Sequence, residues 1–235
     1  MHAATLLRQP VRTLIVAATV PLALAAVVDD IRARRRADAA VRLADAARRC
    51  PLTGLYGRDV LVDHIDHLLS TGHSDDVHVL VLDGDDLKGV NDSWGHAAGD
   101  ALIRVYGRRL ARWTSGRPDA CAARLGGDEF GLAVRLPAPA ALEELAALRD
   151  LMQQPVTLDN GHVVALTMSI GFACAGDLPG EDASRLLRGA DAAMYEVKTE
   201  REPFPYRATY ADAYAETVNG RRGGRHGAHL PAGAL

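Results

Sequence analysis

The sequence predicts a mixed domain of helices and strands in the middle of the chain. Apolar residues recur at helical spacing in several segments, short apolar runs of strand length alternate with them, and glycine-containing turns join some of those runs. The chain has 235 residues, of which 48% are hydrophobic and 24% are charged. It can therefore hold one domain of roughly 150 to 180 residues with its own core.

The N-terminal segment, residues 1–28, differs in character from the rest. Residues 13–28 form a run of 16 residues without charge, slightly short of the ~20 needed to span a bilayer. Arginines flank the run, and more of them follow it than precede it. We expect a membrane anchor that holds the protein at the cytoplasmic face of the cell membrane, the rest being cytoplasmic. A cleavable signal peptide and an apolar helix packed on a partner are the alternatives.

Residues 29–50 predict a connecting helix, because they are rich in Ala, Arg and Asp and end at Pro51. The globular domain is expected over residues 51–202. In the tail, residues 203–235, Tyr206, Tyr210 and Tyr214 stand at helical spacing and predict a packed stripe. From about residue 219, Gly, Arg and His dominate and predict disorder.

The elements predicted inside the domain alternate between the two periodicities. In order, they are a helix over 58–69, a strand over 77–82, helices over 87–93 and 98–113, a hairpin of strands 121–125 and 130–134, a helix over 140–154, a hairpin turn at 159–161, an apolar run over 163–175, and a helix over 182–199. In the helix over 98–113, apolar residues at three- and four-residue steps predict one buried stripe.

Charge and cysteine usage narrow the class of protein. The net charge of −3 argues against a general nucleic-acid binder, so phosphate binding must be local. Cys50, Cys121 and Cys174 lie far apart and lack the spacing of a metal site, which predicts a reduced compartment.

Two acidic turns are the strongest chemical signal. Gly126 and Gly127 allow a sharp turn between two strands, with Asp128 and Glu129 at its mouth. Asp83 ends the apolar strand over 77–82, a good place to hold Mg²⁺ against phosphates. Taken alone, a Gly-Gly-Asp-Glu turn is more often an ordinary acidic surface turn than a site. At the other turn, the alternative is that Asp85 or Asp86 simply caps the following helix. Together the two turns predict one site.

Separated motifs then carry a family resemblance. They read Asp83-x-Asp85-x-x-Lys88-x-x-Asn91-Asp92-x-x-Gly95-His96-x-x-Gly99-Asp100 and Arg124-x-Gly126-Gly127-Asp128-Glu129-Phe130, with Leu52-Thr53-Gly54-Leu55 before them and Ser169-Ile170-Gly171 and Ala190-Asp191-x-Ala193-Met194-Tyr195-x-x-Lys198 after them. Over about residues 51–198 the sequence resembles the GGDEF family of diguanylate cyclases. The resemblance implies an α+β fold with a central, mostly antiparallel sheet flanked by helices. This fold is nucleotidyl-cyclase-like with a ferredoxin-like core, here preceded by an N-terminal helix.

The resemblance also implies an activity. The family condenses two GTP molecules into cyclic di-GMP and releases two pyrophosphates, with one GTP per subunit of a homodimer. The implied cofactor is Mg²⁺ or Mn²⁺, held by the side chains of Asp83 and Asp128 and the carbonyl of Gly84. Asp128 and Glu129 are the implied catalytic residues, and Asn91 and Asp100 match the positions that read guanine. The remaining implied substrate-binding residues are Leu87, Lys88, Gly126, Gly127, Lys198 and Arg201.

This chain departs from the family pattern at several positions. The family usually continues two residues after Lys198 with Gly-Arg-Asn, whereas here Arg201 stands one position early. Gly84 replaces a bulky apolar residue and Leu87 replaces Phe. A catalytically weak or inactive module that binds GTP or a partner protein is therefore the alternative hypothesis. A cyclase that makes a mixed dinucleotide fits Asn91 and Asp100 less well.

A product-inhibition site of the family, Arg-x-x-Asp, is also incomplete. Arg117 matches its arginine, but Ala120 stands at the aspartate position and Asp119 is one residue early. We therefore expect feedback inhibition by cyclic di-GMP to be weak or absent.

Overall fold

A computed structural model describes residues 8–165, 167–178, 180, 182–199 and 204–214. The chain divides into two compact units at the boundary between Arg48 and Arg49. Each unit is described separately below.

The first unit consists of helix α1 (Arg8–Ala47). This single helix contains both the apolar run and most of the segment predicted to connect it to the domain. Its charged half carries ion pairs one turn apart, Asp29 with Arg32 at 3.3 Å and Asp30 with Arg34 at 2.9 Å. In the part of the chain that the structure describes, no helix combines the length and the apolarity needed to cross a membrane.

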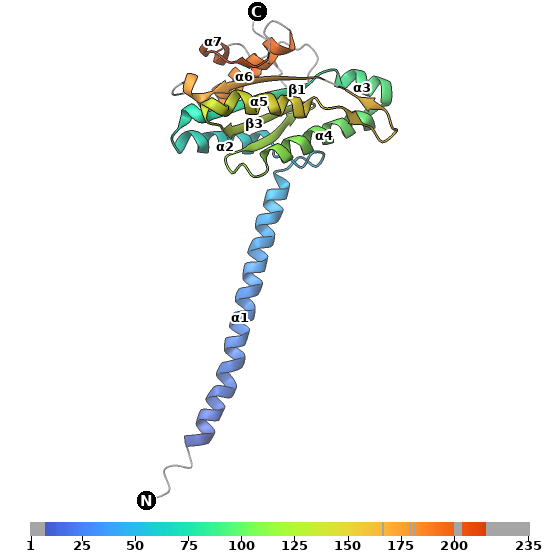
Figure 1. Cartoon of the computed structure of the whole chain (residues 1–235). Helices are drawn as coiled ribbons and strands as arrows, with labels where there is room; N and C mark the ends of the chain where they lie inside the picture. Colours follow the sequence, from blue (N-terminus) through green and yellow to red (C-terminus); the bar gives the residue numbers. More distant parts are fainter. Residues whose placement is uncertain (1–7, 166, 179, 181, 200–203, 215–235) are drawn as a thin grey trace, which may run out of the picture. The chain divides into compact units, whose positions relative to one another are not determined.

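The second unit is built on a five-stranded sheet (Figure 1). Its strands lie in the order β2 (Cys121–Gly126), β3 (Glu129–Arg135), β1 (Val77–Gly84), β6 (Met168–Cys174) and β7 (Tyr206–Arg207). The first four strands pair antiparallel, and only β7 is parallel to its neighbour. The predicted α+β fold with a mostly antiparallel sheet is confirmed.

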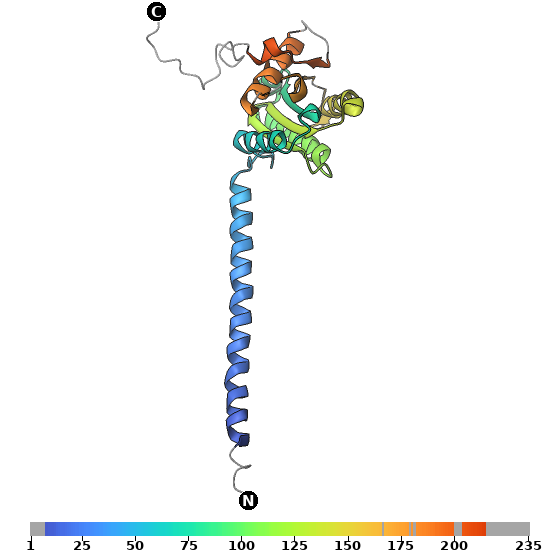
Figure 2. The same ribbon diagram turned by 90° about the vertical axis from the view of Figure 1, so that its left-hand side faces the viewer.

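Helices cover both faces of the sheet, and the central strand β1 is therefore buried along its whole length. Leu80 and Leu82 pack toward α4 (His96–Thr114) and α5 (Ala138–Met152). The alternate residues Val79 and Val81 pack toward α2 (Arg58–Ser70) and α6 (Ala183–Lys198). Figure 2 shows α4 and α5 on the right of the sheet and α2 and α6 on the left. The apolar stripe predicted on α4 is buried.

Short elements complete the unit. They are η1 (Ser74–Asp76), α3 (Leu87–Trp94), β4 (Val156–Thr157), β5 (Val163–Val164), η2 (Ala175–Asp177) and α7 (Tyr210–Ala213). The apolar run over 163–175 is not one element: β5 pairs with β4 in a separate two-stranded hairpin, whereas β6 joins the main sheet.

The packed tyrosine stripe predicted for the tail is wrong. Tyr206 lies in β7, which extends the sheet and breaks the helical spacing. Tyr210 and Tyr214 are 57% and 47% exposed, and their rings contact each other at a centroid distance of 4.8 Å. The segment predicted to be disordered, from about residue 219, lies outside the described residues.

Candidate active site

The site begins at the C-terminal end of β1, where a carboxylate is completely buried. Asp83 has no exposed surface, and it lies opposite Glu129 on β3 and Ser169 on β6. Directly opposed residues share one face of an antiparallel sheet, here the face covered by α6. From the last turn of α6, the Lys198 ammonium donates to the Asp83 carboxylate. A cation therefore sits at Asp83 in the structure itself.

Asp85 belongs to the same group of side chains, although the sequence did not single it out as a site residue. Its carboxylate accepts hydrogen bonds from the hydroxyls of Thr167 at 2.7 Å and Ser169 at 2.9 Å. It also lies 3.6 Å from the Lys198 ammonium. The neighbouring Asp86 has a different role, because it caps α3 by accepting from the Gly89 N–H at 3.2 Å. The Asp83-x-Asp85 spacing at the end of β1 is the sequence signal that points to Asp85.

The glycine turn between β2 and β3 brings Asp128 beside the end of β1. Gly126 and Gly127 have φ values of 156° and 51°, conformations that glycine adopts without strain. The Asp128 carbonyl accepts from the N–H of Gly84 at 3.2 Å, which joins the two acidic turns. Burial raises the pKa of Tyr106 beneath this junction to about 12, and the nearby carboxylates act in the same direction. Tyr106 therefore stays a neutral hydroxyl.

The residues predicted to read guanine lie together on α3 and α4. A Cβ at Gly99 would lie only 2.1 Å from the Asn91 Oδ1 atom, so this glycine lets α3 approach α4 closely. Asp100 follows directly and is half-exposed, with Arg104 at 3.9 Å. Lys88 is exposed on α3, whereas Leu87 packs against the core. Asn91 and Asp100 are thus presented by helices near the end of β1, with α4 covering the face opposite α6.

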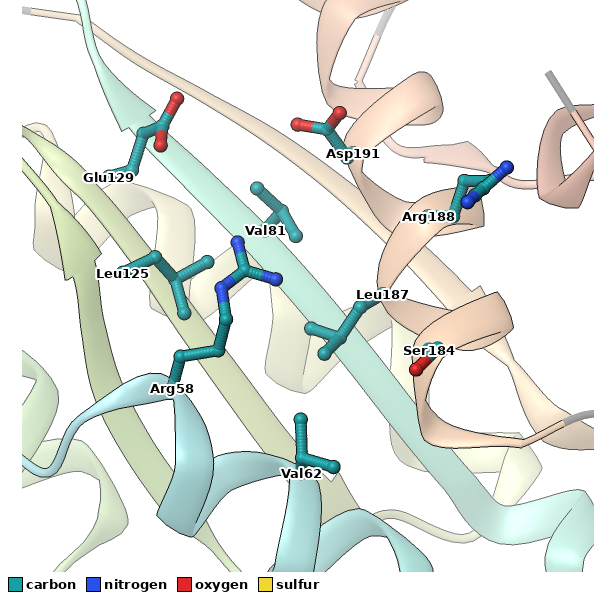
Figure 3. A pocket seen from close by; sticks show the side chains of 9 residues that line it. All are labelled: Arg58, Val62, Val81, Leu125, Glu129, Ser184, Leu187, Arg188 and Asp191. Carbon is teal, nitrogen blue, oxygen red and sulfur yellow. The ribbon is translucent and has the colours of Figure 1, made fainter. Parts of the chain in front are cut away.

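A cavity of about 260 Å³ approaches Glu129 on the α6 face. It is lined by Arg58, Val62, Val81, Leu125, Glu129, Ser184, Leu187, Arg188 and Asp191. In Figure 3 the Arg58 side chain extends from α2 toward Val81 of β1 and Leu125 of β2. Asn91 and Asp100 are not part of this lining, so the cavity is separate from the residues predicted to read guanine. No sequence motif points to Arg58 or Arg188.

The donors predicted for a metal fit a hard divalent cation. They are oxygen atoms from the carboxylates of Asp83 and Asp128 and from the carbonyl of Gly84. The contact with the Lys198 ammonium shows that the Asp83 carboxylate can bind a cation. Among the described residues, no three His, Cys, Asp or Glu side chains converge as a ready-made metal site. Arg201 lies outside the described residues.

The residues matching the product-inhibition motif are engaged elsewhere. The Arg117 guanidinium donates to Glu144 at 2.8 Å and lies 4.1 Å from the centre of the Trp113 ring. Asp119 pairs with Arg135 at 3.7 Å. Neither side chain is directed to a common site.

Comparison with known proteins agrees with this arrangement. The family model "Diguanylate cyclase, GGDEF domain" matches residues 47–203. An uncharacterised protein of Mycobacterium tuberculosis is 40% identical over 180 residues, which cover 75% of this chain and 28% of that protein. The diguanylate cyclase DgcN of Escherichia coli is 35% identical over 154 residues, 64% of this chain and 37% of DgcN. The chain thus spans well under half of either relative.

A solved structure shows the same fold. It is the GGDEF domain of PA1120 (TpbB or YfiN) from Pseudomonas aeruginosa, which superposes with a TM-score of 0.63 at 30% identity over 70% of this chain and 96% of that one. The family match spans strands β1, β2, β3 and β6 of the sheet, the glycine turn and α6, which together hold the acidic site. On sequence and on fold alike, the chain belongs to the GGDEF-domain family of diguanylate cyclases.

Proposed function

We propose that the chain is an active diguanylate cyclase that condenses two GTP molecules into cyclic di-GMP and two pyrophosphates. The observation that carries the proposal is the convergence of Asp83, Glu129 and Lys198 at the end of β1, with the Asp128 turn bonded to the same strand end. Anionic and cationic groups meet there beside helices that present Asn91 and Asp100. Phosphate charge and a purine base require such a combination.

The proposed chemistry needs two subunits. Each 3′-hydroxyl attacks the α-phosphate of the other GTP, loses its proton, and forms a P–O bond while the bond to pyrophosphate breaks. Bound Mg²⁺ or Mn²⁺ would neutralise phosphate charge, held by Asp83, Asp128 and the Gly84 carbonyl. Glu129 lies beside Asp83 and would help to hold the metal or take the 3′-hydroxyl proton. Asn91 and Asp100 would fix guanine, and Lys198 would neutralise phosphates together with Lys88 and Arg201.

The direct test is product formation. The full chain is incubated with GTP and Mg²⁺, and the products are separated by chromatography. We expect cyclic di-GMP from the unmodified chain and a loss of at least about a hundredfold in Asp128→Ala. Asp159→Ala, which changes an exposed aspartate in the β4–β5 turn, is the matched control. A folded, dimeric sample that forms no cyclic di-GMP would exclude the proposal.

A catalytically weak or inactive module that binds GTP or a partner is the second candidate. The shifted position of Arg201 favours it, since the usual phosphate contact would then be lost. Calorimetry separates the two candidates: saturable GTP binding without turnover would support the second. If it binds GTP, Asp100→Ala should abolish the binding.

Dimerisation and location are separate parts of the proposal. Because each subunit holds one GTP, the rate per subunit should rise with protein concentration until the dimer is saturated. Attachment to the cytoplasmic face of the membrane through residues 13–28 is supported by their uncharged sequence and flanking arginines. Recovery of a tagged chain wholly in the soluble fraction would exclude that attachment.

A further inference from the structure

Arg124, two residues before the glycine turn, joins two distant segments of the domain. Its Nε and one terminal nitrogen donate to the Gly127 carbonyl at 3.0 and 2.9 Å. Its other terminal nitrogen contacts the Cys50 sulfur at 3.3 Å. One guanidinium therefore holds the turn that carries Asp128 and also contacts the first segment of the domain.

The Gly126-Gly127 turn needs such a restraint, because its own residues do little to hold its conformation. Gly126 and Gly127 are exposed and lack side chains, and glycine loses more conformational freedom on ordering than any other residue. The β2–β3 register also shifts between Arg124 and Gly126, so regular strand pairing stops there. A planar guanidinium can place two donors on one carbonyl, which a single ammonium cannot do with the same geometry.

The segment that carries Cys50 is itself fixed to the sheet. The Cys50 N–H donates to the Leu55 carbonyl at 2.7 Å, and the Gly54 N–H donates to the Cys50 carbonyl at 2.8 Å. The Arg124 N–H in turn donates to the Tyr56 carbonyl at 2.9 Å. The Cys50 sulfur is thus a fixed point against which the Arg124 side chain is held.

We propose that Arg124 is a positioning residue of this site, which holds the Gly126-Gly127 turn in place with Cys50 as the second anchor of its guanidinium. The inference rests on the proposed cyclase function. Through Arg124, the segment around Cys50 at the start of the domain would control the position of the catalytic turn. Arg124 acts through Gly127 on the placement of Asp128 and is not itself a group that touches substrate.

The strength of the contact depends on pH. Burial raises the pKa of Cys50, but hydrogen bonds from Arg124, Thr53 and the Leu52 backbone outweigh it and lower the pKa from 9.0 to about 7. Cys121 on the adjoining strand stays a neutral thiol, because burial raises its pKa to about 11.

Among the described residues that contact Cys50, Arg124 is the cation at its sulfur, and it approaches from β2. The neighbouring Arg49 is directed elsewhere: its guanidinium lies 3.9 Å from the centre of the Tyr56 ring and donates to the Gly54 carbonyl at 3.1 Å. Since the pKa of Cys50 is lowered on folding, the stabilisation by the ionised contact is complete above about pH 9 and is lost as the pH falls through about 7.

The first experiment measures the contact without turnover. Alkylation of the full chain by iodoacetamide is followed against pH, with Cys50→Ser to identify the Cys50 signal, since Cys121 and Cys174 are buried. We expect a midpoint near pH 7 in the unmodified chain and a clearly higher midpoint in Arg124→Gln. Arg112→Gln, at an exposed arginine of α4, should leave it unchanged. Equal midpoints in all three proteins would overturn the proposal.

The second experiment measures the effect on the reaction. In Arg124→Gln and Arg124→Lys we expect kcat to fall about ten- to a hundredfold while KM for GTP changes less than about threefold, because only the catalytic turn is misplaced. In the unmodified chain we expect kcat to rise through about pH 7 as Cys50 ionises. This rise should disappear in Cys50→Ser, and Cys50→Asp should keep the high rate below that pH. An unchanged kcat in Arg124→Gln would overturn the proposal. If the unmodified chain makes no product, the cyclase function fails and this role fails with it, whereas a shifted alkylation midpoint would still demonstrate the contact.

Discussion

At the scale of single residues, the site contains a buried carboxylate, Asp83, that is paired with the ammonium of Lys198. Asp83 is fully buried, and an ionised carboxylate is costly to bury unless a cation and hydrogen bonds compensate. Lys198 supplies that cation from α6 and remains partly exposed itself. We also expect Lys198 to contact the substrate phosphates. One side chain would then contribute both to substrate binding and to the stability of the substrate-free protein.

This pairing predicts a specific change in stability. Lys198→Gln should lower the free energy of unfolding by roughly 2 kcal/mol, because the Asp83 carboxylate loses its cation while staying buried. Adding Asp83→Asn should recover part of that loss. Urea unfolding measures both, with the exposed Lys88→Gln as the control that stays within about 0.5 kcal/mol. Equal unfolding free energies for Lys198→Gln and Lys88→Gln would contradict the prediction.

At the scale of elements, the packing of α6 against β6 decides whether Lys198 reaches Asp83. A Cβ at Gly171 on β6 would lie 1.9 Å from the Met194 nitrogen and 2.4 Å from the Ala190 carbonyl oxygen. Backbone of the helix therefore rests directly on the strand. The close approach explains why a glycine stands in the Ser169-Ile170-Gly171 strand, which the sequence showed only as a motif.

Two alanine substitutions at this interface should behave in opposite ways. Gly171→Ala should destabilise the domain by about 3 kcal/mol or more, since the helix must move off the strand. Gly189→Ala, inside α6 with its nearest neighbour at 3.4 Å, should be neutral or stabilising by up to about 1 kcal/mol. Thermal unfolding of both variants provides the measurement. A similar loss in both would show that the close contact is not the cause.

At the scale of the whole molecule, the residues that match the family's product-inhibition motif are held in other contacts. Arg117 is held by Glu144 and Trp113, and Asp119 is paired with Arg135. Binding product at these side chains would require those contacts to break, and Ala120 offers no replacement carboxylate.

We therefore expect micromolar cyclic di-GMP to leave the initial rate of the full chain essentially unchanged. Initial rates are measured with and without added product, and Arg117→Gln serves as the matched variant. Strong inhibition of the unmodified chain that Arg117→Gln relieves would show that this surface is a working product site after all.

The sequence by itself determined the family, the order of most elements and the two acidic turns. Motif residues such as Asp83, Asn91, Asp100 and Asp128 are local signals, and strand and helix periods repeat over a few residues. It failed where long-range pairing decides the outcome. The run over 163–175 forms two separate strands, because β5 and β6 belong to different sheets. Tyr206 is in a strand and not in the predicted helical stripe, because β7 pairs with β6.

Only the tertiary structure decided which side chains meet. The register of β1 with β3 places Glu129 beside Asp83, and α6 returns Lys198 to Asp83 across 115 residues of chain. The contact of Arg124 with Cys50 spans 74 residues in the same way. Such contacts depend on how strands pair and helices pack, a property of the assembled sheet that no local pattern encodes.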